Sequence, residues 1–174
     1  QAMTLSFYER IGLERGFTRD MVTMALVIYG IVTIFPAPLA ALLQNRVSVT
    51  AIIAFGPIFQ AIFSLLTTHT HNYMVFALAG PFMAFTILFV HTFAFGLLAR
   101  LDPTGRAVAG TPAMLMVGAA IAPFISGTLV KFISFEAIGY ACCIAVAAQV
   151  YLFSQTRKAV LSSTALPKSV IKDE

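Results

Sequence analysis

The chain has 174 residues, of which 59% are hydrophobic and 10% charged, with a formal net charge of +4 and a mean hydropathy of +0.91. Soluble domains carry about a quarter charged residues, so this composition excludes a water-soluble fold, whose surface would expose large apolar patches. The basic residues are scattered at the ends of apolar stretches rather than gathered on one face, and we therefore expect no nucleic-acid partner.

Five stretches without Asp, Glu, Lys or Arg are long enough to cross a hydrocarbon core of about 30 Å as helices. They are residues 21–43, 47–67, 73–99, 107–130 and 137–153. They are apolar on all sides, whereas the strands of a membrane barrel alternate polar and apolar residues. We therefore predict an all-α integral membrane protein that is surrounded by the lipid bilayer.

The segments outside these spans give the organisation of the chain. Residues 1–16 are predicted to form the end of a truncated transmembrane helix and the start of an outer loop, so the sequence is expected to begin within a longer protein. Residues 17–153 form a five-helix bundle whose short connections make consecutive spans antiparallel neighbours. Residues 154–174 are polar and contain Pro167, which predicts a mobile tail.

The distribution of Lys and Arg predicts the orientation, because cytoplasmic loops carry an excess of both. One side of the membrane holds Arg46, Arg100, Arg106, Arg157, Lys158, Lys168 and Lys172. The other side holds Lys131 together with Arg10, Arg15 and Arg19, which Glu9, Glu14 and Asp20 offset locally. We predict a multi-pass protein of the cell inner (plasma) membrane with its C-terminus in the cytoplasm.

Two spans share a pattern of glycine and proline. Gly30 precedes Pro36 in the first span, and Gly118 precedes Pro123 in the fourth. This correspondence favours two three-helix units, residues 1–67 and 73–153, like the internal repeats of secondary transporters. Chance is the alternative explanation of so short a pattern.

One connection resembles a known family. Residues 100–106, Arg-Leu-Asp-Pro-Thr-Gly-Arg, lead into a span that contains Gly-Ala-Ala-Ile-Ala-Pro at 118–123. This Asp-x-x-Gly-Arg followed by Gly-x4-Pro resembles the loop between the tenth and eleventh spans of transporters of the major facilitator superfamily (MFS). Residues 8–12, Tyr-Glu-Arg-Ile-Gly, resemble the end of the seventh span in the same superfamily. The resemblance implies the C-terminal half of a twelve-span carrier, whose missing N-terminal half is a partner.

The loop after the first complete span departs from the family pattern. Many members carry Gly-x-x-x-Asp-Arg-x-Gly-Arg there, whereas this chain has Ala-Leu-Leu-Gln-Asn-Arg at 41–46, with no acid and no second glycine. Arg46 is the charged residue that remains as a candidate for a cytoplasmic gate.

The resemblance implies that the spans at 21–43, 73–99 and 107–130 line a central cavity, and the polar residues there become candidates for a substrate or proton pathway. The candidates are Tyr29, Thr33, Thr86, His91 and Thr111, with Glu9 before the first complete span. An ionisable residue inside a span often marks such a pathway. The alternatives are a neutral His91 that hydrogen bonds to a neighbouring helix and a Glu9 that is solvated at the membrane surface.

Asp102 and Arg106 are the other gate candidates that the resemblance implies, with Arg106 docking on acidic groups. As a structural alternative, the segment forms a tight turn and Asp102 binds local backbone. We expect no metal site at His69 and His71, which lack a nearby carboxylate or cysteine. We expect no cofactor and no enzyme activity, because the chain has no phosphate-binding loop, nucleophile motif or intramembrane acid pair.

The sequence therefore predicts part of a secondary active transporter of small organic solutes that works by alternating access. Proton coupling is compatible with this prediction. The alternative is a non-transporting polytopic membrane subunit or assembly scaffold.

Overall fold

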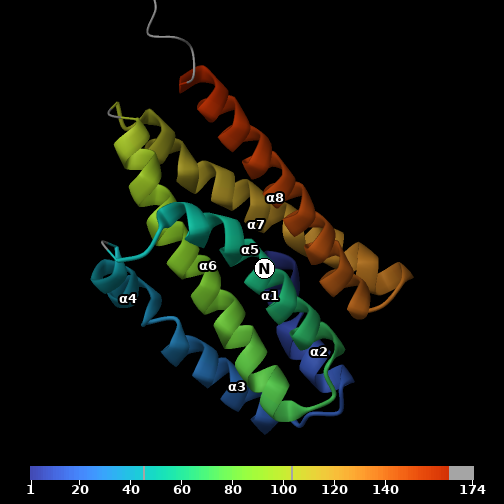
Figure 1. Cartoon of the computed structure of the whole chain (residues 1–174). Coiled ribbons are helices and arrows are strands. Elements are labelled where there is room, and N and C mark those ends of the chain that lie inside the picture. Colours follow the sequence, from blue (N-terminus) through green and yellow to red (C-terminus); the bar gives the residue numbers. More distant parts are fainter. Residues whose placement is uncertain (45, 103, 165–174) are drawn as a thin grey trace, which may run out of the picture.

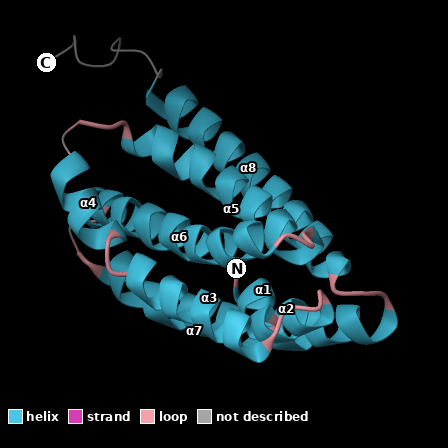
Figure 2. Cartoon of the chain, turned by 90° about the horizontal axis from the view of Figure 1, so that it is seen from below, coloured by secondary structure: helices cyan, strands magenta, loops and turns pink. Residues whose placement is uncertain are grey.

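The computed structural model of the chain describes residues 1–44, 46–102 and 104–164, with residues 156–164 as backbone only. This described part contains helices, turns and short connections but no strand (Figure 2). Five stretches are long and apolar enough to cross a membrane. The prediction of an all-helical chain with five apolar spans is confirmed.

The helices follow the predicted order along the chain (Figure 1). They are α1 Ala2–Ser6, α2 Tyr8–Glu14, α3 Arg19–Val32, α4 Pro36–Leu43, α5 Val49–His69, α6 Tyr73–Leu101, α7 Arg106–Phe132 and α8 Glu136–Thr164. The last helix continues beyond the predicted span end, so the first part of the predicted tail, residues 154–164, is helical. Residues 165–174, with Pro167 and two of the tail lysines, lie outside the described residues.

A polar side chain caps the start of three of the spans. The hydroxyls of Thr18 and Ser48 accept hydrogen bonds from the third backbone N–H of α3 and α5, and the Asn72 side chain accepts two at the start of α6. Such caps satisfy donors that have no partner within the helix. The α7 start instead follows Gly105, whose positive φ of 71° suits a glycine.

The first span is interrupted near its middle. Its two parts, α3 and α4, are separated by residues 33–35, a break that the unbroken apolar stretch at 21–43 did not predict. Pro36 and Pro38 lack the N–H groups that the carbonyls of Val32 and Ile34 would meet in a continuous helix. The Val32 carbonyl accepts from Phe35 N at 3.3 Å instead. The prolines inside α5, α6 and α7 leave those helices continuous.

Four helix pairs build the bundle. Helix α5 packs along both α6 and α8, α3 packs against α6, and α1 packs against α7. Consecutive long helices run in opposite directions, as the short connections predicted (Figure 1). The N-terminal segment, residues 1–14, is therefore an integral part of the packing and does not lie apart from the five spans.

One cluster of buried apolar side chains lies at one end of the bundle. Its fully buried members include Tyr8 and Ile11 of α2, Phe76 of α6 and Ile138 of α8. We call this the clamped end: the last turn of α2, the starts of α3, α6 and α8, and the ends of α5 and α7. The opposite end, with the end of α4, the starts of α5 and α7 and the end of α6, is the open end.

Glycines allow close packing in this core. A Cβ atom on Gly80 would overlap the ring of Tyr8, and one on Gly12 would lie 2.8 Å from Cγ2 of Val22. The Tyr8 ring stacks on Phe76 with centroids 4.4 Å apart, and its hydroxyl donates to the Phe76 carbonyl at 3.0 Å. Helices α3 and α6 thus meet the N-terminal segment with almost no room for larger side chains.

Helix α7 is covered over only part of its length. Ala122 and Ser126 are buried, and the Phe7 ring lies against nearby Gly127. Gly118, one turn before Ala122 on the same helix, faces open space, as do the large apolar side chains around it. The small residues therefore receive a neighbouring helix only toward the clamped end.

Candidate functional site

Arg15 joins three elements at the clamped end. Its Nη2 group donates to the backbone carbonyl of Thr68 and forms an ion pair with Glu136, while Nη1 lies 3.3 Å from Nε2 of His71. The Arg15 side chain is only 9% exposed. Its ion-pair partner among the described residues is thus Glu136, the first residue of α8, which is distant in sequence.

The two histidines near the end of α5 have different neighbours. Nε2 of His71 faces Arg15, whereas Nδ1 of His69 lies 3.1 Å from the Leu65 carbonyl. The two histidines therefore do not converge, and no metal-binding group of three or more His, Cys, Asp or Glu occurs among the described residues.

A second polar group is buried among α1, α5 and α8. The Thr4 hydroxyl lies 2.8 Å from that of Ser64 and 3.7 Å from the sulfur of Cys142. All three side chains are buried, so each hydroxyl needs a partner inside the protein. This cluster ties the N-terminal segment to α5 and α8.

Most of the predicted pathway residues make local contacts in the described part of the chain. Thr86 and His91 are five positions apart on α6 and so lie about 140° apart around the helix. The half-buried His91 ring stacks on Phe95 with centroids 5.3 Å apart. Thr33 and Thr111 donate to carbonyls of their own helices. Only Tyr29 has a distant partner, since its hydroxyl accepts from Gln1 at 3.4 Å.

Glu9 and the predicted gate residues are at the surface. Glu9, Arg46 and Arg106 are exposed, and the ion pair of Arg15 is the only one in the described part of the chain. Asp102 accepts from the Thr104 hydroxyl and from Ala107 N at 2.7 Å. These bonds, from Thr104 first and then Ala107, lower the pKa of Asp102. Asp102 therefore acts as a local cap for the start of α7.

The break in the first span places two predicted residues beside unpaired backbone. Tyr29 and Thr33 flank the last turn of α3, where the Thr33 hydroxyl donates to the Gly30 carbonyl at 2.7 Å. Ile34 follows in the break, is 67% exposed, and has a carbonyl that would meet Pro38 in a regular helix. Proline positions were visible in the sequence, but the consequence for Ile34 required the helix boundaries.

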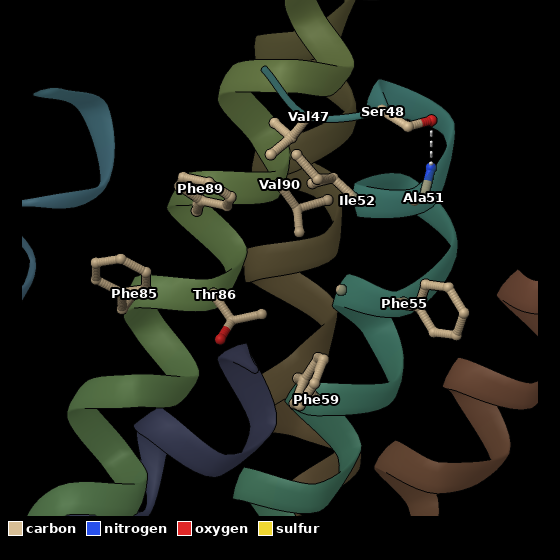
Figure 3. A pocket seen from close by; sticks show the side chains of 11 residues that line it. Val47, Ser48, Ala51, Ile52, Phe55, Phe59, Phe85, Thr86, Phe89 and Val90 are labelled. Atoms are coloured by element: carbon tan, nitrogen blue, oxygen red, sulfur yellow. Dashed lines mark hydrogen bonds between the residues drawn. The ribbon is translucent and has the colours of Figure 1, made fainter. Parts of the chain in front are cut away.

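An apolar groove of about 450 Å³ lies between α5 and α6 (Figure 3). Its rings are Phe55, Phe59, Phe85 and Phe89, and its polar members are Ser48 and Thr86. The Thr86 hydroxyl donates to the Phe82 carbonyl at 2.8 Å, and Ser48 caps α5. The Thr86 hydroxyl proton and the Ser48 oxygen are thus both engaged in local hydrogen bonds. The groove therefore suits hydrocarbon better than a polar solute.

The comparisons with protein-family models, with curated proteins and with solved structures find no match for this chain.

Proposed function

We propose that the chain is part of a secondary active transporter of small organic solutes that works by alternating access, as the MFS resemblance of residues 100–123 and 8–12 implies. In this proposal a further set of spans supplies the other wall of the pathway, and the open end faces the cytoplasm because Arg46, Arg100 and Arg106 lie there.

The broken first span is the observation that carries the proposal. Non-helical backbone at membrane depth is tolerated where it is buried in protein or lines a water-filled cavity, because lipid offers no hydrogen-bond partner. The exposed break at residues 33–35 therefore favours a cavity or a protein neighbour on this face over lipid. Interrupted helices of this kind form the substrate sites of many secondary transporters.

The pairing of helices supports the same proposal. In such a repeat, α1–α2 of the first unit corresponds to α6 of the second, α3–α4 corresponds to α7, and α5 corresponds to α8. Exchanging the two units then turns the pair α1 with α7 into the pair α6 with α3. Both of these pairs occur, and the pair α5 with α8 maps onto itself. These three pairs agree with two repeated three-helix units related by a pseudo-two-fold axis, whereas the extensive pair α5 with α6 maps onto a smaller contact between α8 and α1.

The exposed face of α7 favours a protein neighbour as well, and this observation also suits the alternative of a non-transporting subunit or scaffold. Met114, Met116 and Phe124 are each at least 70% exposed. A scaffold needs such faces for its partners but needs no water at the break in the first span. Hydration of that break therefore separates the two functions.

The test is the accessibility of Ile34 in the protein expressed from its complete gene. Ile34→Cys is introduced after the natural cysteines of that protein are replaced by serine, and open membranes and intact cells are each treated with a charged, membrane-impermeant thiol reagent. A transporter predicts rapid labelling of Ile34→Cys and none of Phe55→Cys, which lies in the apolar groove. Protection of both positions, in both open membranes and intact cells, would overturn the water-lined pathway and leave the scaffold.

A further inference from the structure

A small groove at the open end combines one cation with an apolar floor. It has a volume of about 170 Å³ and lies between α4, the start of α5 and the last turns of α6. Arg100 and Gln44 line it at the helix ends, and Thr92, Gly96 and Ala40 line it deeper. Gly96 and Thr92 precede Arg100 by one and two turns, about 6 and 12 Å along the helix. The groove thus runs from the membrane boundary into the hydrocarbon region.

The floor of the groove is hollow because it is built from small residues. A Cβ atom on Gly96 would have no heavy atom within 4 Å, and Ala40 and Ala41 face the same space from α4. The Thr92 hydroxyl donates to the Leu88 carbonyl at 2.9 Å, so its proton is already used. The deep part of the groove therefore offers van der Waals contact and no unused donor.

The mouth of the groove carries a positive charge that no acid of the described residues neutralises. Arg100 is exposed and forms no ion pair in that part of the chain. The acid next to it in sequence, Asp102, is held by Thr104 and Ala107. The amide of Gln44 adds a neutral donor at the same level.

We propose that this groove binds one anionic phospholipid. The phosphate group lies at Arg100 within reach of the Gln44 amide, and an acyl chain passes over Gly96 toward Thr92. A soluble anion would use the mouth alone, whereas a phospholipid uses both the charge and the apolar floor. Basic pockets between transmembrane helices bind lipid head groups in this way. The site does not depend on the transport function.

Native mass spectrometry of the detergent-purified full-length protein tests the site. Phosphatidylglycerol and phosphatidylcholine are titrated separately, and the affinity of the first bound lipid is measured. The wild type should bind phosphatidylglycerol more tightly, and Arg100→Gln should weaken that binding about fivefold while leaving phosphatidylcholine unchanged. Arg106→Gln removes a neighbouring exposed cation outside the groove and should leave both affinities unchanged.

A second pair of variants tests the apolar floor. Gly96→Leu fills the hollow, where an added Cβ atom has no heavy atom within 4 Å, and should weaken the first binding event for phosphatidylglycerol at least as much as Arg100→Gln. Gly118→Leu, also in open space on a helix, is its control and should have no effect. Equal losses in Arg100→Gln and Arg106→Gln, or unchanged binding in Gly96→Leu, would overturn the site. Displacement of the lipid by glycerol phosphate alone would assign the mouth to a soluble anion instead.

Discussion

The clamped end and the open end of the bundle are held by different kinds of contact. At the clamped end, hydrogen bonds of Tyr8, Arg15 and Tyr73 reach elements that are distant in sequence. At the open end, the side chains of Thr92 and Asp102 bind only within their own helix or loop. A bundle fastened at one end and locally capped at the other can change the spacing of its helices at the open end without breaking its core.

The largest effect should come from filling the contact between α2 and α6. Gly80→Leu places a side chain into the Tyr8 ring and should lower the free energy of unfolding by about 3 kcal/mol, because the packed core cannot expand freely. Gly118→Leu should change it by less than about 1 kcal/mol, since open space surrounds that glycine. Thermal unfolding in detergent, followed by circular dichroism, compares the two. Equal destabilisation would contradict the contrast between the ends.

The next effect should come from Arg15. Arg15→Gln removes the ion pair with Glu136 and leaves the Thr68 carbonyl without this donor, which should cost about 2 kcal/mol of unfolding free energy. Arg106→Gln, which removes an exposed cation at the open end, should cost less than about 0.5 kcal/mol. The same unfolding assay measures both, and Arg15→Lys should recover only part of the loss because one ammonium cannot match the guanidinium fork.

The structural features discussed so far were not all visible in the sequence. Hydropathy and charge located all five spans, because a lipid-facing helix must be apolar along its whole length. The pairing of Arg15 with Glu136 was not predictable, since the two residues are 121 positions apart and Glu14 is adjacent. The break before Pro36 was also missed, because an apolar run is equally compatible with a bent and an interrupted helix.

The candidate site was predicted less well than the fold. Polar residues inside spans can be found by inspection, but their faces depend on helix packing. Thr86 faces the groove between α5 and α6, whereas His91 lies on another side of the same helix. Asp102 shows the opposite case: its role as a cap was one of the two alternatives that the local pattern indicated, and its bonds to Thr104 and Ala107 support that alternative.

The smallest effect should come from Asp102 at the open end. Its pKa is lowered in the folded state by the Thr104 and Ala107 bonds, so its stabilising contribution is present at neutral pH. That contribution should be lost as the pH falls through and below the usual range of a carboxyl group. Asp102→Asn should therefore lower the Tm slightly at neutral pH and make no difference in strong acid. A Tm loss comparable to that of Arg15→Gln would show that the open end is as tightly fastened as the clamped end.

Because only part of α7 is buried, this helix can pivot about its buried contacts. It runs from Arg106 to Phe132, and its buried contacts at Ala122 and Ser126 lie well toward one end. The arm from Ser126 back to Arg106 is about 30 Å long, so a tilt of about 10° around those contacts would carry the Arg106 end by about 5 Å. A rotation too small to disturb the packing around Ser126 would thus displace a whole helix end by the width of a small solute.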